Sequence, residues 1–198
     1  MRKILVLLAI TFCALYGAQA QVKWGANAGI NISNVHHLEV VHPKSLVTVQ
    51  FSGFAAVPLS KSFIIQPSLG YRGKGFKIAG SFDSTRNHTN VAYNYLQLSA
   101  PVLLRCNKND NYKLYAGAGP YLAYLLNVKS DGSHLPIDNY NRVDFGFDFS
   151  IALTIGKRWV VELASDLGFS NVYSLGSGVW GQSPSNIRSG LTLGYFIN

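Results

Sequence analysis

The chain has 198 residues, of which 13% are charged and 13% aromatic, with 19 glycines. Soluble domains carry about 25% charged residues, so this composition argues against an ordinary soluble domain. The net charge of +8 comes from residues spread along the chain, not from a basic run of the kind that binds nucleic acid.

Residues 1–20 have the three parts of a secretory signal peptide. Arg2 and Lys3 form the basic start, an apolar segment covers 4–16, and Ala18-Gln19-Ala20 matches a cleavage site. A membrane-anchoring helix is the alternative, but the apolar segment is too short to span a bilayer. We therefore expect an exported protein with one mature domain, residues 21–198, and no nucleic-acid partner.

Two further features narrow the class of this mature domain. Cys106 is its only cysteine, which excludes a disulfide framework and leaves an inert thiol near a turn as the simplest interpretation. After residue 20 no segment approaches the roughly 18 apolar residues of a membrane-spanning helix. A closed β-barrel is the other structure that satisfies all its backbone groups in lipid.

Side-chain character alternates with a period of two through most of the mature chain, as it does in barrel strands. In 142–155 every odd position is apolar, while the even positions are polar or small. The same pattern predicts eight strands, in chain order at about 22–32, 47–57, 63–72, 96–105, 113–127, 142–155, 159–170 and 187–197.

The charged residues of these strands all fall on one face. The eight apolar faces contain no Lys, Arg, Asp or Glu, and the opposite faces hold Lys23, Arg72, Lys74, Arg105, Lys113, Arg142, Asp144, Asp148, Glu162, Asp166 and Arg188. A charge facing lipid costs about 2–4 kcal/mol at mid-bilayer, whereas a soluble barrel has charges outside. The pattern therefore predicts an all-β, eight-stranded antiparallel transmembrane barrel with its charges inside.

The links between strands alternate strictly between long and short. The long links are about 33–45, 79–90, 130–141 and 171–186, and the short ones about 58–62, 106–111 and 156–158. Outer-membrane barrels have long extracellular loops and short periplasmic turns, so we assign the links in this way. Aromatic residues near both strand ends, such as Trp24 and Phe145, would form the two interfacial girdles.

Two local features depart from the simple pattern. Val91 and Tyr93 are out of phase with Leu96, which predicts a bulge or slip in segment 90–95. Three prolines fall inside strands, where each removes a ladder hydrogen bond and favours a strand end or a bulge: Pro67, Pro101 and Pro120.

Three stretches resemble the PorT-like outer membrane protein beta-barrel domain family. They are Y-L-Q-L-S-A-P-V-L-L-R at 95–105, L-Y-A-G-A-G-P-Y-L-A-Y-L-L at 114–126, and the last strand. In the last strand, Arg188, Gly190, Leu193 and Tyr195 are spaced like the signal that barrel-insertion machinery reads. The resemblance implies an outer-membrane barrel in a Gram-negative bacterium, and a few such proteins are linked to secretion across that membrane.

No catalytic motif is present, and no cofactor is expected. The inward acids Asp148, Glu162 and Asp166 could serve acid–base catalysis. An eight-stranded barrel is filled by side chains, however, so ion pairing is the preferred role. The predicted structural network in the lumen comprises Arg72, Arg105, Arg142, Asp144, Asp148, Glu162, Asp166 and Arg188.

The long links hold the remaining candidate binding residues: His36, His37, His42, Tyr173 and Trp180. The three histidines could bind a metal ion, but their flexible spacing favours solvated loop residues and we predict no metal site. The aromatic residues could recognise a partner or pack over the barrel mouth.

Three functional hypotheses follow. The first is a non-enzymatic outer-membrane protein, structural or interacting through its loops, with lipid, insertion machinery and secretion or extracellular components as partners. The second is a barrel that binds or conducts a small ligand or ion, although eight strands leave little lumen. The third is a membrane-embedded enzyme that uses the inward acids.

Overall fold

The computed structural model describes residues 22–36, 43–79, 88–109, 111–131, 133–172 and 185–197. The predicted signal peptide, 1–20, lies outside these residues. The strands are β1 (Lys23–His36), β2 (Lys44–Pro58), β3 (Phe63–Ile65), β4 (Ser68–Ala79), β5 (His88–Ser99), β6 (Val102–Arg105), β7 (Tyr112–Ser130), β8 (Ser133–Leu135), β9 (Val143–Ile155), β10 (Trp159–Gly168) and β11 (Ser185–Phe196), with a 3-10 turn η1 (Ile137–Asn139).

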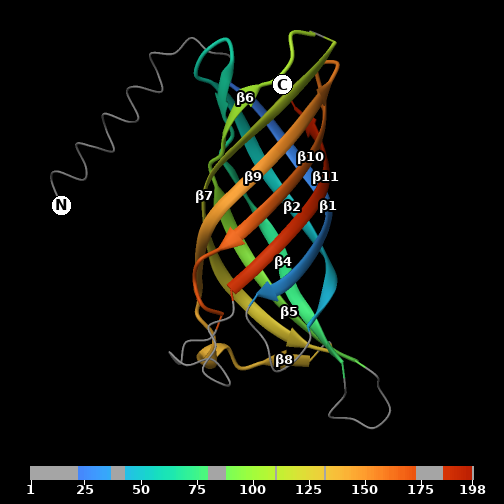
Figure 1. Ribbon diagram of the computed structural model, residues 1–198, viewed down its shortest axis with the longest axis vertical. Coiled ribbons are helices and arrows are strands. Elements are labelled where there is room, and N and C mark those ends of the chain that lie inside the picture. Colours follow the sequence, from blue (N-terminus) through green and yellow to red (C-terminus); the bar gives the residue numbers. More distant parts are fainter. Residues whose placement is uncertain are drawn as a thin grey trace, which may run out of the picture.

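The strands form one closed antiparallel barrel, which confirms the predicted fold class (Figure 1). Each wall strand pairs with its neighbours in the chain, and the ring closes where β1 pairs with β11 from Gly25–Phe196 to His36–Ser185. Closure leaves no sheet edge in the wall, so the backbone groups of the spanning part are satisfied without water.

The wall of the barrel has eight strand positions, because two of these positions are each divided into two short strands. Pro67 separates β3 from β4, and Pro101 separates β5 from β6. The two interruptions lie side by side, since the Gln66 backbone N–H donates to the Pro101 carbonyl oxygen at 2.9 Å. Each proline therefore lies where its own strand stops, as expected for a residue without a backbone N–H.

Pro120 does not follow this expectation, because it lies within the long strand β7 and pairs with Phe147. Its carbonyl oxygen accepts a hydrogen bond from the Ala100 backbone N–H. In a strand the nitrogen and carbonyl of one residue point to the same side, so the missing N–H also faces the Ala100–Pro101 break. A ladder hydrogen bond is lost only where the neighbouring strand is already interrupted.

The bulge or slip predicted for segment 90–95 is confirmed as a change of register. Val91, Tyr93 and Tyr95 are all buried, and β5 pairs with β4 without a register shift, so β5 itself has no bulge. The register does shift at this point, between Asn94 and Tyr95, but the additional residue, Leu126, is in β7. The apolar side chains that broke the expected pattern fill the barrel interior.

The outer surface is the apolar face that the alternation predicted. In β9 the outward residues Phe145, Phe147, Phe149 and Ile151 are each about half exposed, at 44–51%. Aromatic contacts run along both rims: Trp159 packs against Tyr195, and Phe145 packs against Phe169. No helix of the described part of the chain is long and apolar enough to cross a membrane.

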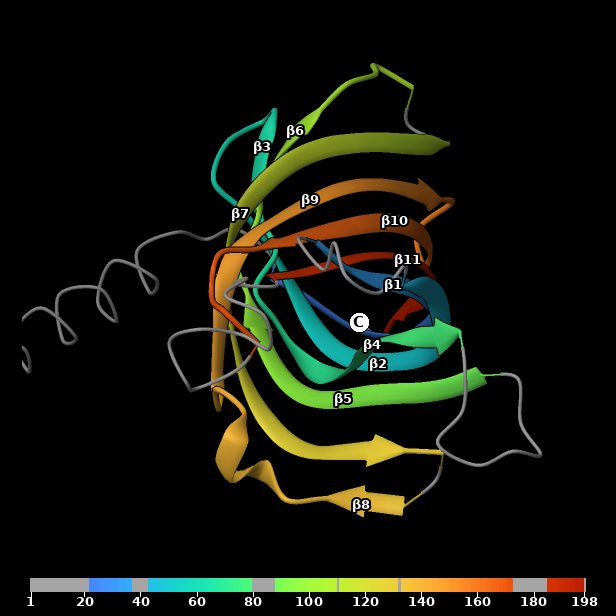
Figure 2. The same cartoon turned by 60° about the horizontal axis from the view of Figure 1, so that its bottom comes forward.

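The two ends of the barrel differ in how evenly the strands end (Figure 2). At one end, short links 59–62, 106–111 and 156–158 join neighbouring strands. At the other end the wall rises unevenly, because β7 continues past its last β9 partner, at Tyr124, and pairs with β5 and β8. Several strands extend further into the predicted long links than the periodicity indicated.

We expect Leu163→Lys to lower the free energy of unfolding by about 2–4 kcal/mol, because Leu163 is half exposed on the lipid face in the middle of β10. Urea unfolding in phosphatidylcholine vesicles measures this loss. The matched control is Leu59→Lys in the short link 59–62, where the side chain is 58% exposed and the expected change is within about 0.5 kcal/mol. Equal losses in the two variants would contradict the membrane-facing assignment.

Candidate functional site

The strongest concentration of functional chemistry is a buried charged layer at mid-height inside the barrel. Its residues come from even positions of β4, β9, β10 and β11, because those positions face inward in each strand. The charged members with at most 8% exposure are Arg72, Lys74, Asp144, Asp148, Glu162, Asp166 and Arg188.

Asp166 and Arg188 form the centre of this layer. Nε and Nη2 of Arg188 donate to Oδ2 and Oδ1 of Asp166, both at 2.7 Å, which is a bidentate ion pair. The side chains of both residues are 0% exposed. Short, paired, charge-assisted hydrogen bonds of this kind offset part of the cost of removing two charges from water.

Lys74 joins this pair to a second acid. Its ammonium nitrogen lies 3.0 Å from Asp144 Oδ2 and 3.5 Å from Asp166 Oδ2. The same nitrogen lies 4.4 Å from the ring centroid of Tyr121 and 5.3 Å from that of Tyr95. Two carboxylates and two aromatic faces thus replace the water that a lysine would otherwise bind.

Neutral side chains complete the hydrogen bonding of the central pair. Arg188 Nη1 donates to Asn31 Oδ1 at 2.9 Å and to Gln50 Oε1 at 2.8 Å, while Gln97 donates to Asp166 at 3.1 Å. These partners lie on β1, β2 and β5, so the network links walls on different sides of the barrel.

A second polar group surrounds Glu162, toward the short links. Ser150, Asn27 and Gln66 donate to its carboxylate at 3.0, 3.3 and 3.4 Å. Ser150 also contacts Asp148 at 3.1 Å. Because a hydroxyl carries one proton, Asp148 and Glu162 share this donor. Within the described residues no cation contacts Glu162 directly.

Two apolar clusters enclose the charged layer. On the loop side, the cluster includes Phe76, Tyr93, Leu125 and Val128. On the side of the short links, the second cluster contains Phe54, Ala56, Ala152, Val160 and Phe196. The two clusters reduce the contact of the network with both aqueous phases, which strengthens each ion pair and raises the cost of leaving a charge alone.

The family comparison decides what kind of barrel this is. The family model described as outer membrane protein beta-barrel domain matches residues 18–174. The chain belongs to this outer-membrane barrel family. It is accordingly a barrel of the outer membrane of a Gram-negative bacterium.

Solved structures share the architecture of this outer-membrane barrel. Neisserial surface protein A matches with 13% identity and a TM-score of 0.52, covering 88% of this chain and 95% of its own. Ail, the attachment invasion locus protein of Yersinia pestis, was solved with the heparin analogue sucrose octasulfate. It has 13% identity and a TM-score of 0.47, covering 89% of this chain and 99% of its own. At such identity the likeness concerns the fold alone. The curated proteins gave no match.

Two members of the predicted lumen network lie at strand ends and not in the charged layer. Arg142 precedes β9 and its exposed guanidinium lies 3.7 Å from Asp138, an exposed residue four positions earlier. Arg105 ends β6 and donates to the Asn109 carbonyl oxygen in a short link. Both residues have the inward parity, but both lie at strand ends, where parity no longer places a side chain inside the barrel.

Lys74 was predicted to face inward but was not included in the network, although it contacts two acids. The available signal was its position two residues after Arg72 on the same face of one strand. Arg72 itself is buried, yet its Nε and Nη1 donate to no group among the described residues. The sequence places both cations inside without showing which one reaches the acids.

The predicted loop-binding residues cannot be placed around a site. His37, His42, Tyr173 and Trp180 lie outside the described residues, as does the side chain of His36. Within the described ranges, no three His, Cys, Asp or Glu residues come together in a way that could hold a metal ion.

The four residues of the predicted insertion signal alternate across β11. Arg188 and Gly190 face inward, whereas Leu193 is 54% exposed on the lipid face and Tyr195 packs on Trp159. A Cβ atom on Gly190 would lie 2.5–2.6 Å from atoms of Asn31, Gln50 and Arg188. Gly190 therefore also provides the space in which the Arg188 guanidinium meets its neutral partners.

We expect Asp166→Asn and Arg188→Gln each to lower the free energy of unfolding by about 3–5 kcal/mol, because each leaves a buried charge without its partner. The double variant should lose less than the sum of the two. Urea unfolding in vesicles of one composition measures this double-mutant cycle.

The exposed pair Asp138–Arg142 supplies the control cycle, with an expected change within about 1 kcal/mol. Losses at Asp166 and Arg188 as small as those of this control would contradict a stabilising role for the buried pair.

Proposed function

We propose that this outer-membrane barrel is a non-enzymatic protein that acts through contacts made by its loop end. The observation that carries the proposal is the contrast between an interior occupied by a hydrogen-bonded charged layer and a wall that continues above it on one side. The charged layer leaves little room for a path through the barrel at its height, whereas the part of the wall that extends beyond it offers a surface.

The interior supports a barrel without a conducting path. Arg188, Lys74, Gln97 and Asn31 each have at most 2% exposure, and they occupy the barrel at one height. Two of the three acids considered for catalysis are engaged as well: Asp166 by Arg188, and Glu162 by Asn27, Gln66 and Ser150. The third acid, Asp148, shares the Ser150 hydroxyl with Glu162. An acid held in this way does not present an oxygen to a substrate.

The raised wall supports a role in recognition. β7 residues 127–130 pair with β5 on one side, and residues 128–130 pair with the short strand β8 on the other (Figure 2). Lys129 and the exposed His134 are register partners in this sheet. In the described part of the chain β8 pairs only with β7, and an edge strand of this kind can add a strand from a partner.

We further propose a secretion-associated partner, or an extracellular one, at this loop end. The proposal rests on the resemblance of residues 95–105 and 114–126 to the PorT-like group. Insertion into the membrane would use the β11 residues Arg188, Gly190, Leu193 and Tyr195. Tyr173 and Trp180, in the predicted long link 171–186, are proposed to add to the contact.

In planar lipid bilayers we expect the purified wild-type protein to show no discrete conductance steps at 1 M KCl, because buried side chains fill the lumen. The control is the same preparation after mass-spectrometric confirmation of intact, folded protein in the bilayer-forming vesicles. Regular single-channel steps from the folded protein would contradict the proposal and favour the conducting alternative.

We expect the double variant Lys129→Glu/His134→Glu, expressed in a strain that lacks the gene, to insert normally into the outer membrane. It should not restore the amount of exported protein in the medium, which is the quantity measured. Lys61→Glu/Lys108→Glu, in two short links at the opposite end, is the matched control and should restore wild-type levels. Full restoration by the loop-end variant would contradict the proposed contact surface.

A further inference from the structure

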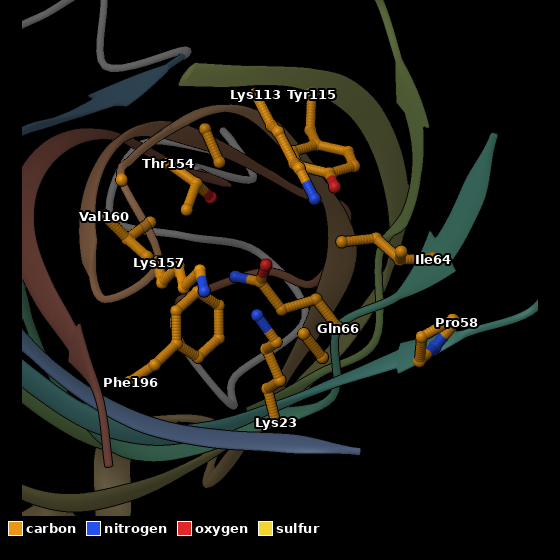
Figure 3. Close-up of a pocket in the computed structure, with 13 residues that line it drawn as sticks. Lys23, Pro58, Ile64, Gln66, Lys113, Tyr115, Thr154, Lys157, Val160 and Phe196 are labelled. Atoms are coloured by element: carbon orange, nitrogen blue, oxygen red, sulfur yellow. The ribbon is translucent and has the colours of Figure 1, made fainter. Parts of the chain in front are cut away.

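The end of the barrel with the short links contains a cavity that the proposed loop-end function does not use (Figure 3). Its volume is about 480 Å³, within the range of about 300–1,000 Å³ that is usual for small-molecule sites. It opens at the predicted periplasmic side and is formed by inward residues of β1, β2, β3, β7, β9, β10 and β11.

Three lysines from separate parts of the chain extend into this cavity. Lys23 begins β1, Lys113 lies at the start of β7, and Lys157 lies in the link between β9 and β10. Gly156 adopts a φ of 61°, the left-handed conformation that favours glycine, and so shapes the tight turn that carries Lys157. Figure 3 shows the three side chains approaching the cavity from different sides.

No acid accompanies these lysines. The lining residues, all of them described, include no Asp or Glu, and no ion pair joins the three lysines to an acid within the described ranges. Like charges gathered at a low-dielectric surface repel one another and attract an anion. The charge of the lining therefore favours an anion in the cavity.

The remaining lining adds apolar walls and neutral donors. Phe196, Val160 and Ala152 are at most 5% exposed and form one wall. Gln66 and Thr154 contribute an amide and a hydroxyl at the inner part, and Gln66 also donates to Glu162, so the cavity ends at the buried polar layer. A ligand that matches this lining has an apolar part as well as its charge.

We propose that this cavity binds an organic phosphate monoester with an apolar group, taken up from the periplasmic side. The phosphate dianion would lie among Lys23, Lys113 and Lys157, since lysine binds phosphate as a point charge. The apolar group would pack against Phe196 and Val160. The same chemistry is available from a soluble phosphate ester and from the headgroup of phosphatidic acid, which is itself a phosphate monoester.

The test uses the full mature chain in nanodiscs of neutral lipid, titrated calorimetrically with phenyl phosphate, inorganic phosphate and benzyl alcohol. We expect saturable binding of phenyl phosphate, weaker binding of inorganic phosphate and none of benzyl alcohol. Lys113→Gln and Lys157→Gln should each weaken phenyl phosphate binding about tenfold or more, because each removes one charge-assisted contact.

Lys61→Gln and Lys108→Gln are the matched controls, because they remove the same charge from the same end of the barrel outside the cavity. Their affinity should stay within about twofold of the wild type. No saturable binding to the folded wild-type protein, or an equal loss in the control variants, would overturn the proposal.

The two sources of phosphate are separated by repeating the titration in nanodiscs that contain phosphatidic acid. If the wild type binds phenyl phosphate with a lower apparent affinity in these nanodiscs than in neutral ones, the lipid headgroup is identified as the occupant. This outcome also requires that Lys113→Gln bind phenyl phosphate equally in the two lipid compositions. An unchanged affinity identifies a soluble ester. The loop-end variant Lys129→Glu/His134→Glu should bind phenyl phosphate with the affinity of the wild type. The failure of one proposal can therefore be distinguished from the failure of the other.

Discussion

The bidentate contact between Asp166 and Arg188 is the interaction on which the interior depends. A barrel in lipid has apolar residues outside, so its polar residues must be inside. Eight strands enclose too little space for bulk water, and charges placed there need protein partners. Arg188 satisfies Asp166, and Lys74 extends the contact to Asp144. The charged layer thus replaces, by hydrogen bonds across the lumen, the apolar core of a soluble domain.

The two apolar clusters give the two ends of the barrel different characters. Toward the loops, Phe76, Tyr93 and Leu125 cover the charged layer under the raised part of the wall. Toward the short links, the cluster around Phe196 forms one wall of the lysine-lined cavity. The buried charged layer lies between these two clusters. A contact at the loops and a ligand at the opposite end are therefore compatible as independent properties of one barrel.

The irregularities of the wall have two causes. One is the backbone chemistry of proline, and the other is the filling of the interior by side chains. Pro67 and Pro101 interrupt adjacent strands at one height, and Pro120 faces that interruption, so the lost hydrogen bonds are confined to one region. The additional residue of β7, Leu126, lies where Tyr93 and Tyr95 fill the lumen opposite. Beyond that point β7 leaves β9 and supports β8, which builds the raised wall.

The period-two pattern by itself determined the eight walls, their lipid-facing sides and the inward direction of Asp148, Glu162, Asp166 and Arg188, because lipid exposure constrains every second residue of a strand. It could not decide which inward charges meet. Parity included Arg105 and Arg142, which lie at strand ends, and it did not show that Lys74 contacts two acids. Pairing inside a barrel depends on the stagger and tilt that bring residues of different walls to one height, and these are properties of ring closure. The convergence of Lys23, Lys113 and Lys157 on one cavity has the same origin: they are far apart in the sequence, and only the closed barrel brings them together.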